Sequence, residues 1–334
     1  MRVLVIVGGW PKPGHFVHTF TKRQVESLQA LGIECDLWNL EELASGWRKY
    51  LAGIGRVSTR IRQQPYDLIH AHFGYCGWVA RSQFRQPVVV SFMGDDLLGT
   101  PDAMGRSKKH SRLIVQLNRW MARTVDAVIV KSPQMARVVA PIKADVVSNG
   151  VDLDLFQPID ARQARAQLGW SQDKRYVLFP GCADVPVKGF PQAQAAVRHT
   201  IEQVTEPVEM IKLCKVPPDK VPLYMNACDV LLMTSWHEGS PNVVKEAMAC
   251  NLPVVSVAVG DVPELLSGME EGIICPRDTK VLSAALTKVL SAPRRTNGRE
   301  LLKRKGLDLE SVARKVLDIY EDVLTRKGKK KSDS

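Results

Sequence analysis

Two glutamates, Glu238 and Glu246, stand in the stretch S-W-H-E-G-S-P-N-V-V-K-E-A-M-A, which begins at Ser235. A carboxylate accepts hydrogen bonds through two oxygens, which suits the vicinal hydroxyl groups of a ribose or a hexose. Glu246 lies four residues after Asn242, so the two share one helix face, and helical side chains lean back toward the N-terminus. We therefore expect Glu238, in a loop, and Glu246, in a helix, to hold two parts of one ligand.

The elements around this pair follow from the neighbouring residues. The apolar run Val230–Thr234 predicts a strand, and ligands bind at the carboxyl ends of strands in open α/β sheets. Ser240 is a favourable N-cap and Pro241 is favoured at the first helical position, so a helix should begin there. Its free N–H groups suit a diphosphate or sugar oxygens, and Gly239 permits close approach of a ligand to the backbone.

The whole chain alternates short Val-, Ile- and Leu-rich runs with longer amphipathic stretches, the pattern of parallel strands joined by crossover helices. A turn-rich segment, 149–158, separates two such series, so an α/β fold with two domains is expected. The predicted strands are Val3–Val7, Ile33–Trp38, Asp67–His70, Val88–Phe92, Ala127–Val130 and Asp145–Ser148, then Tyr176–Pro180, Val208–Leu213, Val230–Thr234, Pro253–Val257 and Gly272–Cys275.

We expect the domains to span residues 1–158 and 159–306. A last helix at 307–325 repeats apolar residues at helical spacing and should pack back on the first domain. The basic segment 326–334 is expected to be a flexible tail. It could contact an anionic membrane, as could the basic segment around Arg106–Arg112 and the apolar helix face that follows it.

Composition narrows the class of protein. The 334 residues are 45% hydrophobic and 24% charged, as in soluble globular enzymes. The early apolar run is too short for a signal peptide or a bilayer span, so a cytoplasmic location is expected. The net charge of +11 implies an anionic partner, but no nucleic-acid-binding signature is present. The seven cysteines lack metal-site spacing, so we expect reduced thiols and no metal.

The chain resembles the retaining glycosyltransferases of family 4, which share the GT-B architecture: two Rossmann-like domains with parallel sheets that face a cleft, and a C-terminal helix that crosses back to the first domain. The resemblance rests on the E-x7-E pattern from Glu238 to Glu246. Further matches are Asn149-Gly150-Val151-Asp152 with Phe156, Lys188-Gly189-Phe190, and Gly260-x-x-x-Glu264.

The resemblance implies a nucleotide diphosphate sugar as donor, with a UDP-sugar favoured and a GDP-sugar as the alternative, and no cofactor. Glu238 would lie near the sugar hydroxyls and Glu246 would hold the ribose. Lys188 would neutralise the leaving diphosphate, and Val216 and Tyr224 would lie beside the base. The implied donor contacts are Gly14, Lys188, Val216, Tyr224, Glu238, Gly239, Ser240, Pro241, Asn242, Val243 and Glu246.

This chain departs from the family pattern at three places. Met93 stands where the family commonly has a histidine, so either that histidine is dispensable here or Asp95 or Asp96 supplies a polar contact from the same loop. Cys182 stands where an arginine usually joins the lysine, which leaves phosphate stabilisation to Lys188, helix ends and an unidentified partner. His15 follows Gly14 where a second glycine is usual, and it could face the acceptor.

Two histidines, His70 and His72, close the third predicted strand and could line the acceptor side. We expect this pair to point to opposite faces of the strand, one into the core and one outward. The acceptor-side candidates are therefore His15, His72 and Asp96. No third ligand accompanies the histidines, so they do not suggest a metal site.

The expected reaction is front-face transfer of the donor sugar to a hydroxyl group with retention of configuration, and the catalytic candidates are Lys188, Glu238 and Asp95. The acceptor would be a cell-envelope glycan or a lipid-linked intermediate, which would place the protein on the inner face of the membrane. Two alternatives remain open. One is a sugar-nucleotide 2-epimerase of the same architecture. The other is a non-catalytic nucleotide-sugar-binding protein, which is consistent with Met93 and Cys182 in place of the usual histidine and arginine.

Overall fold

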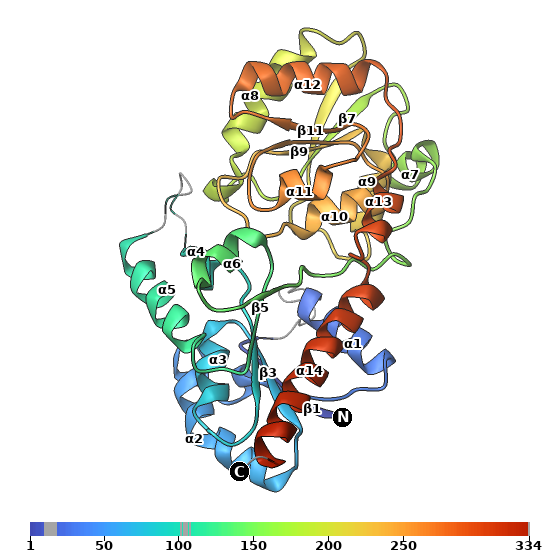
Figure 1. Ribbon diagram of the computed structural model, residues 1–334. Helices are drawn as coiled ribbons and strands as arrows, with labels where there is room; N and C mark the ends of the chain where they lie inside the picture. The colour runs from blue at the N-terminus through green and yellow to red at the C-terminus, as the bar shows by residue number, and fades with distance from the viewer. Residues whose placement is uncertain (10–18, 101, 103–105, 107, 333–334) are drawn as a thin grey trace. The chain divides into compact units, whose positions relative to one another are not determined.

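The computed structural model describes all residues except 10–18, 101, 103–105, 107 and 333–334 (Figure 1). Two compact units are present, one built mainly from the chain up to Gly150 and from Leu309 onward, the other from Val151–Asp308. The division falls at Gly150 instead of the expected 158. The reason is that the Val151 amide donates to the Leu307 carbonyl (2.9 Å) and Phe156 is buried in the core of the second unit.

The first unit contains a six-stranded sheet in which all pairs are parallel, in the order β2-β1-β3-β4-β5-β6. Every strand predicted for this half is present, with ends that differ by two residues at most. The strands are β1 (Arg2–Val7), β2 (Glu34–Asn39), β3 (Leu68–His72), β4 (Val88–Ser91), β5 (Ala127–Val130) and β6 (Asp145–Val146).

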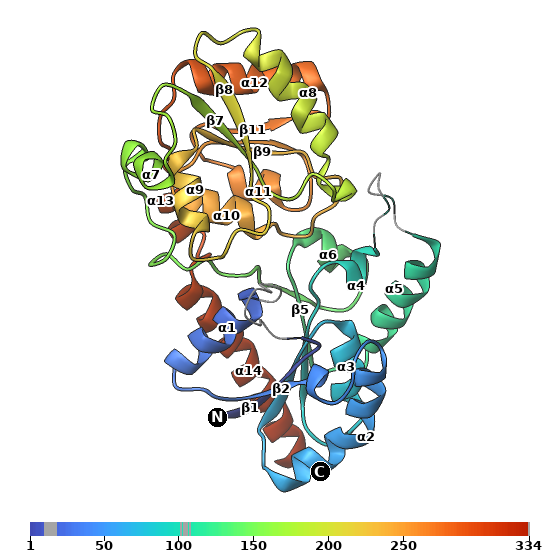
Figure 2. The ribbon, with the colours of Figure 1, turned by 180° about the vertical axis from the view of Figure 1, so that it is seen from behind.

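Helices cover both faces of this sheet, and β1 shows how the sequence directs them. Val3, Val5 and Val7 pack in one apolar cluster with α1 and α14, whereas Leu4 and Ile6 pack in another with α2 and α3 (Figures 1 and 2). The alternation follows from the two-residue period of a strand. The helices of this unit are α1 (Thr19–Ala30), α2 (Arg48–Gln63), α3 (Gly74–Arg81), α4 (Asp95–Leu98), α5 (Lys109–Met121), α6 (Pro133–Val139) and α14 (Leu309–Ser332).

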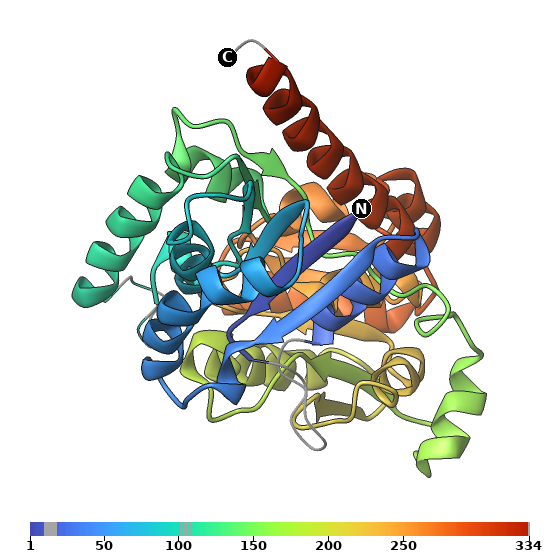
Figure 3. The same cartoon turned by 90° about the horizontal axis from the view of Figure 1, so that it is seen from below.

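The last helix, α14, belongs to the first unit, where it contacts α1, as expected (Figures 1 and 2). Figure 3 shows this helix in red. The buried Tyr320 hydroxyl of α14 lies 2.5 Å from Nδ1 of His70 in β3. The expectation of a flexible tail from residue 326 is wrong as far as Ser332, because the helix continues to that residue. Ion pairs from Arg326 to Asp322 (3.1 Å) and from Lys327 to Asp126 (2.9 Å) support this extension.

The expectation that His70 and His72 point to opposite faces of their strand is also wrong. Their rings lie side by side, with centroids 4.3 Å apart, and both side chains are buried. Residues two apart in a strand share a face, and Leu68 of the same strand packs in the cluster that contains α14. The two histidines therefore face the layer formed by α1 and α14.

The second unit contains a five-stranded parallel sheet in the order β11-β10-β9-β7-β8. All five predicted strands are present: β7 (Arg175–Phe179), β8 (Val208–Lys212), β9 (Val230–Met233), β10 (Val254–Val257) and β11 (Gly272–Cys275). Helices α8 and α12 pack against each other, and α10 packs against α13. The helices are α7 (Ala161–Leu168), α8 (Phe190–Ile201), α9 (Val221–Ala227), α10 (Asn242–Ala249), α11 (Val262–Leu266), α12 (Thr279–Ser291) and α13 (Gly298–Arg304).

The expectation that all cysteines are reduced is wrong for one pair: Cys182 and Cys214 form a disulfide, with their Cα atoms 4.6 Å apart. Cys182 follows β7 and Cys214 follows β8, and these strands are parallel neighbours, so the loops after them begin at the same edge of the sheet. The other five cysteines are free thiols, and four of them are buried.

Within the part of the chain that the structure describes, no helix combines the length and the apolar character needed to cross a bilayer.

Candidate active site

Lys188 and Glu238 meet at the carboxyl edge of the second sheet. Lys188 ends a short 3-10 helix that follows β7, and Glu238 lies in the loop after β9, the neighbouring strand. The Lys188 Nζ lies 2.8 Å from Oε1 of Glu238, and the two side chains are 29% and 17% exposed. The structure thus brings together the cation predicted to meet phosphate and the carboxylate predicted to meet the sugar.

The turn that carries Lys188 is held against the loop after β9. The Thr234 hydroxyl donates to the carbonyls of Lys188 (3.1 Å) and Gly189 (3.0 Å), and the Trp236 amide donates to the carbonyl of Val187 (2.7 Å). Gly189 has φ +70°, and a Cβ there would lie 2.3 Å from the Thr234 carbonyl oxygen. Only glycine allows this approach, so the spacing of Lys188 from Glu238 depends on it.

Arg277, in the loop after β11, braces the same segment. Its guanidinium donates to the carbonyls of Thr234 (2.8 Å) and Ser235 (2.7 Å) and to Oε1 of Gln192 (2.9 Å), and it lies 4.0 Å from the ring centroid of Trp236. Partial burial lowers the pKa of Arg277. Sequence reasoning missed this residue, since an arginine after a strand carries no motif. Because its N–H groups donate to the backbone of the loop after β9, Arg277 stabilises the loop that carries Glu238.

Helix α10 begins one residue later than expected. Pro241, with ψ 116°, is the N-cap without a side-chain cap, and Asn242 is the first helical residue. The fixed φ of proline suits an extended cap as well as a first helical position. The hydroxyl of Ser240, expected to cap the helix, hydrogen-bonds instead to Nζ of Lys245 (3.3 Å) and to the Asp261 carboxylate.

Most of the other residues expected to contact the donor lie on α10 or just before it. Asn242, Val243 and Glu246 are half-buried members of the helix, and the spacing of four places Asn242 and Glu246 on one face. The carbonyl of Gly239 accepts a hydrogen bond from the Asp261 amide (3.2 Å). A carboxylate, a helix start and a cation therefore gather at this edge.

Of the two candidates for contact with the base, Val216 follows β8, the parallel neighbour of β7, so its loop begins at the same edge of the sheet as the turn of Lys188, and Val216 is half-buried. The other candidate, Tyr224, is not brought into this group. Tyr224 lies in α9 with its ring edge-on to Trp170 (5.5 Å), and Trp170 in turn contacts Tyr176 at the amino end of β7. That places the Tyr224 ring toward the opposite edge of the sheet. Gly14 and His15 lie outside the described residues.

Asp96 of the first unit has a clear structural role. Its buried carboxylate accepts hydrogen bonds from the amides of Met93 (3.0 Å), Gly94 (2.9 Å) and Gly74 (3.1 Å), which joins the loops after β3 and β4. Burial raises the pKa of Asp96 to about 6 although the amides oppose the shift. Asp96 thus serves the backbone, whereas the neighbouring Asp95 is exposed in the first turn of α4.

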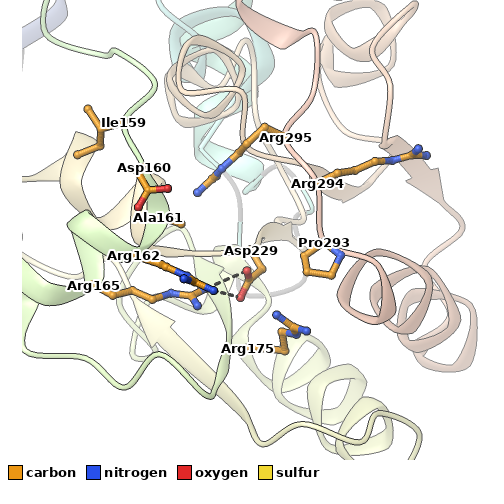
Figure 4. A pocket seen from close by; sticks show the side chains of 10 residues that line it. All are labelled: Ile159, Asp160, Ala161, Arg162, Arg165, Arg175, Asp229, Pro293, Arg294 and Arg295. Carbon is orange, nitrogen blue, oxygen red and sulfur yellow. Dashed lines mark hydrogen bonds and ion pairs between the residues drawn. The ribbon is translucent and has the colours of Figure 1, made fainter.

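A cavity of about 330 Å³ lies at the other edge of the second sheet, beside the start of β7 and the residue before β9 (Figure 4). Five arginines line it, and internal acceptors engage at least three of them: Arg165 donates to both oxygens of Asp229 (2.8 Å each), Arg175 to Glu206, and Arg295 to the Asn226 carbonyl. This cavity belongs to a structural ion-pair network. Among the described residues, no three His, Cys, Asp or Glu side chains are placed to hold a metal ion.

Comparison with known proteins identifies the family. A family model described as Glycosyltransferase Family 4 matches residues 2–155, and one described as Glycosyl transferases group 1 matches residues 187–292. The chain belongs to glycosyltransferase family 4. The resemblance drawn from Glu238 and Glu246 is therefore confirmed, as is the GT-B fold.

Curated family 4 relatives include the D-inositol 3-phosphate glycosyltransferases of Mycobacterium leprae and Mycobacterium tuberculosis. The first is 26% identical over 291 residues, 76% of this chain and 65% of its own length. The second is 28% identical over 272 residues, 67% of this chain and 55% of its own length. The chain thus spans less than two thirds of the length of these relatives.

Two solved structures share the fold over nearly the whole chain. Sucrose-phosphate synthase from Thermosynechococcus elongatus has a TM-score of 0.77 at 19% identity and covers 97% of this chain and 99% of its own. Anabaena HepE, solved in complex with UDP-glucose, has a TM-score of 0.67 at 19% identity and covers 96% of this chain and 100% of its own.

Proposed function

We propose that this family 4 protein is a retaining glycosyltransferase that moves a sugar from a nucleotide diphosphate sugar to a hydroxyl acceptor. The observation that carries the proposal is the Lys188–Glu238 ion pair (2.8 Å) at the carboxyl edge of the second sheet, beside the start of α10. A cation and the N-terminal end of a helix suit a diphosphate, and a carboxylate suits sugar hydroxyls. The three stand together at the edge where α/β sheets bind ligands.

The chemistry follows from the charges. As the bond between the sugar and the diphosphate breaks, negative charge grows on the phosphate, and Lys188 together with the N-terminal amides of α10 stabilises it. Glu238 accepts hydrogen bonds from the sugar and Glu246 from the ribose. In front-face transfer the leaving phosphate oxygen takes the proton of the acceptor hydroxyl, so the reaction needs no side-chain base and no metal.

UDP-glucose is the first donor to test, because Anabaena HepE, which shares the fold, was solved in complex with it. A GDP-sugar is the alternative. The curated relatives are named for D-inositol 3-phosphate, so a phosphorylated polyol is one acceptor class to test. The second is a cell-envelope glycan or a lipid-linked intermediate at an anionic membrane surface.

A feature of α5 supports the membrane-linked acceptor. Leu113 and Trp120 on this helix are 66% and 54% exposed, and Leu117 between them is 46% exposed. Arg112 and Arg119 flank this apolar face, and the net charge of the chain is +11. An apolar face with basic flanks suits docking at the surface of an anionic membrane, on the inner side of which the acceptor would be found.

The test begins with a screen of nucleotide sugars by thermal shift. The stabilising donor is then incubated with inositol phosphate or with cell-envelope lipids, and the linkage of the product is determined by NMR. A product with the anomeric configuration of the donor supports the proposal, and an inverted linkage contradicts retention. Conversion of the donor sugar without an acceptor would indicate the 2-epimerase, and binding without turnover would indicate a non-catalytic protein.

A further inference from the structure

Lys245 is a charged residue in the interior of the second unit. It lies on α10 with no exposed surface, although a lysine is rarely fully buried unless it is paired. Its Nζ lies 3.3 Å from the Ser240 hydroxyl oxygen. Asp261, 6% exposed, is hydrogen-bonded by the same hydroxyl and attracts Lys245 electrostatically. A buried cation, a hydroxyl and a buried carboxylate thus form one network.

This network is attached to the backbone of the candidate site. The Asp261 amide donates to the Gly239 carbonyl (3.2 Å). Gly260 has φ +56°, and a Cβ there would lie 2.5 Å from the carbonyl oxygen of Gly239 and 2.9 Å from that of Glu238. The turn that carries Asp261 therefore lies directly against the segment that carries Glu238.

The charge states of Lys245 and Asp261 determine which group donates each hydrogen bond in the network. Burial lowers the pKa of Lys245 to about 8, while Asp261 and Glu246 oppose that shift. Burial raises the pKa of Asp261 to about 6, an effect that Glu264 adds to and that Ser240 and Lys245 oppose. Between these values both groups are charged. A protonated lysine only donates, so the Ser240 oxygen accepts from Lys245 and its proton goes to Asp261.

We propose that Lys245 is a positioning residue of the donor site, which acts through Ser240 and Asp261 to hold the Glu238–Gly239 backbone and so keeps the Glu238 carboxylate opposite Lys188. That this site binds the donor rests on the proposed function, whereas the contacts among Lys245, Ser240 and Asp261 do not depend on it. Lys245 acts on the loop that carries Glu238, and not on the donor itself.

The test uses Lys245→Met, Asp261→Asn and the double variant, with Lys280→Met on the exposed surface of α12 as control. Titration of the full chain with UDP, and with GDP as the second probe, gives the affinity. Each single change leaves one buried charge without its partner, so we expect affinity to fall about tenfold or more. The double variant should lose no more affinity than either single variant, because both residues act through one network, and the control should bind as the wild type does.

Two further readouts separate positioning from a general loss of stability. Hydrogen exchange of the ligand-free protein should be faster in the loop 236–241 of Lys245→Met, while the strands of the second sheet keep their protection. The acid limb of donor binding should move to higher pH in Lys245→Met, because Asp261 then loses the cation that lowers its pKa.

The outcomes distinguish the two proposals. If the wild type binds neither UDP nor GDP, the proposed function fails. Hydrogen exchange in the loop 236–241 still tests whether Lys245 holds that loop in place. If the wild type binds and Lys245→Met matches it in affinity and loop exchange, the inference about Lys245 is wrong. Independent, additive effects of Lys245→Met and Asp261→Asn would also overturn it.

Discussion

Lys188 and Glu238 neutralise each other in the ligand-free protein, and a donor must change that arrangement. A diphosphate brings negative charge that competes with Glu238 for the Lys188 ammonium, and Glu238 then becomes available to sugar hydroxyls. The ion pair is only partly exposed, so both groups are held in place before the donor arrives. The arrangement at the residue scale therefore predicts different consequences for loss of the cation and loss of a carboxylate.

Lys188→Ala should mainly lower turnover. The charge on the leaving diphosphate is greatest in the transition state, so the loss of the cation should reduce kcat by about 100-fold to 1,000-fold, with a smaller change in the KM for the donor. Steady-state kinetics with the donor found in the screen measures both constants, and Lys280→Ala on the surface is the control. A change confined to KM would contradict a role in the transition state.

Glu246→Gln should mainly weaken donor binding. An amide keeps one acceptor oxygen but loses the charge, and it cannot receive two ribose hydroxyls in the same way. We expect the Kd for the free nucleotide diphosphate to rise by about tenfold, equivalent to about 1.4 kcal/mol. Isothermal titration calorimetry measures it, with the exposed Glu270→Gln as control. Unchanged affinity would remove the ribose role.

At the scale of elements, the turn after β7 depends on a glycine. Gly189→Ala would place a methyl group 2.3 Å from the Thr234 carbonyl oxygen in a backbone with φ +70°. Gly169 has nearly the same φ, +69°, but nothing lies within 4 Å of its Cβ position, so Gly169→Ala tests the conformational cost alone. That cost is about 1 kcal/mol, and Gly189→Ala should exceed it by at least about 1 kcal/mol. Urea unfolding compares the two, and equal losses would show that the turn is not tightly packed against β9.

The anchoring of α14 makes stability depend on pH. Burial, helped by Lys131, lowers the pKa of His70 from 6.5 to about 3, so the neutral ring is the native form. Stability from this group is fully present above pH 6.5 and is lost as the pH falls toward 3. Between pH 6.5 and about 5 the loss is about 2 kcal/mol. Urea unfolding at several pH values should show a shallower dependence for His70→Gln than for the wild type, and the exposed His199→Gln should keep the wild-type dependence.

The sequence predicted the inner strands of both sheets well because they are buried parallel strands, which read as continuous apolar runs, whereas the edge strands β2, β6, β8 and β11 are only partly buried. It placed the helix start after Glu238 one residue early, because Ser240 and Pro241 have strong cap preferences that take no account of tertiary partners. The Ser240 hydroxyl instead contacts Lys245 and Asp261. No sequence feature indicated a role for Lys245, since a lone lysine in an amphipathic stretch usually faces water.

The site was predictable only where a motif and local structure agreed. Glu238, Lys188 and the start of α10 meet as expected because each follows a strand of one sheet. Arg277, Asp261 and the Cys182–Cys214 disulfide were missed, because their partners are distant in the sequence and no spacing rule joins them. Such contacts depend on which strands are neighbours in the folded sheet. The order in which the strands occur along the sequence does not determine that.

At the scale of the whole molecule, the net charge of +11 and the exposed face of α5 should act together on membranes. Long-range attraction brings a cationic protein to an anionic surface, and Leu113, Leu117 and Trp120 can then enter the headgroup region. We expect binding to vesicles of phosphatidylcholine mixed with phosphatidylglycerol, little binding to phosphatidylcholine alone, and a marked loss as ionic strength rises, because salt screens the attraction.

A double variant separates the apolar contribution from the charge. Leu113→Gln with Leu117→Gln leaves the net charge unchanged, so the loss of apolar contact should reduce vesicle binding by about tenfold or more. Ile201→Gln with Val281→Gln removes two exposed apolar side chains from the second unit and should bind as the wild type does. Co-sedimentation with the mixed vesicles measures both. If the two double variants bind equally, charge alone attracts the protein, and α5 does not dock.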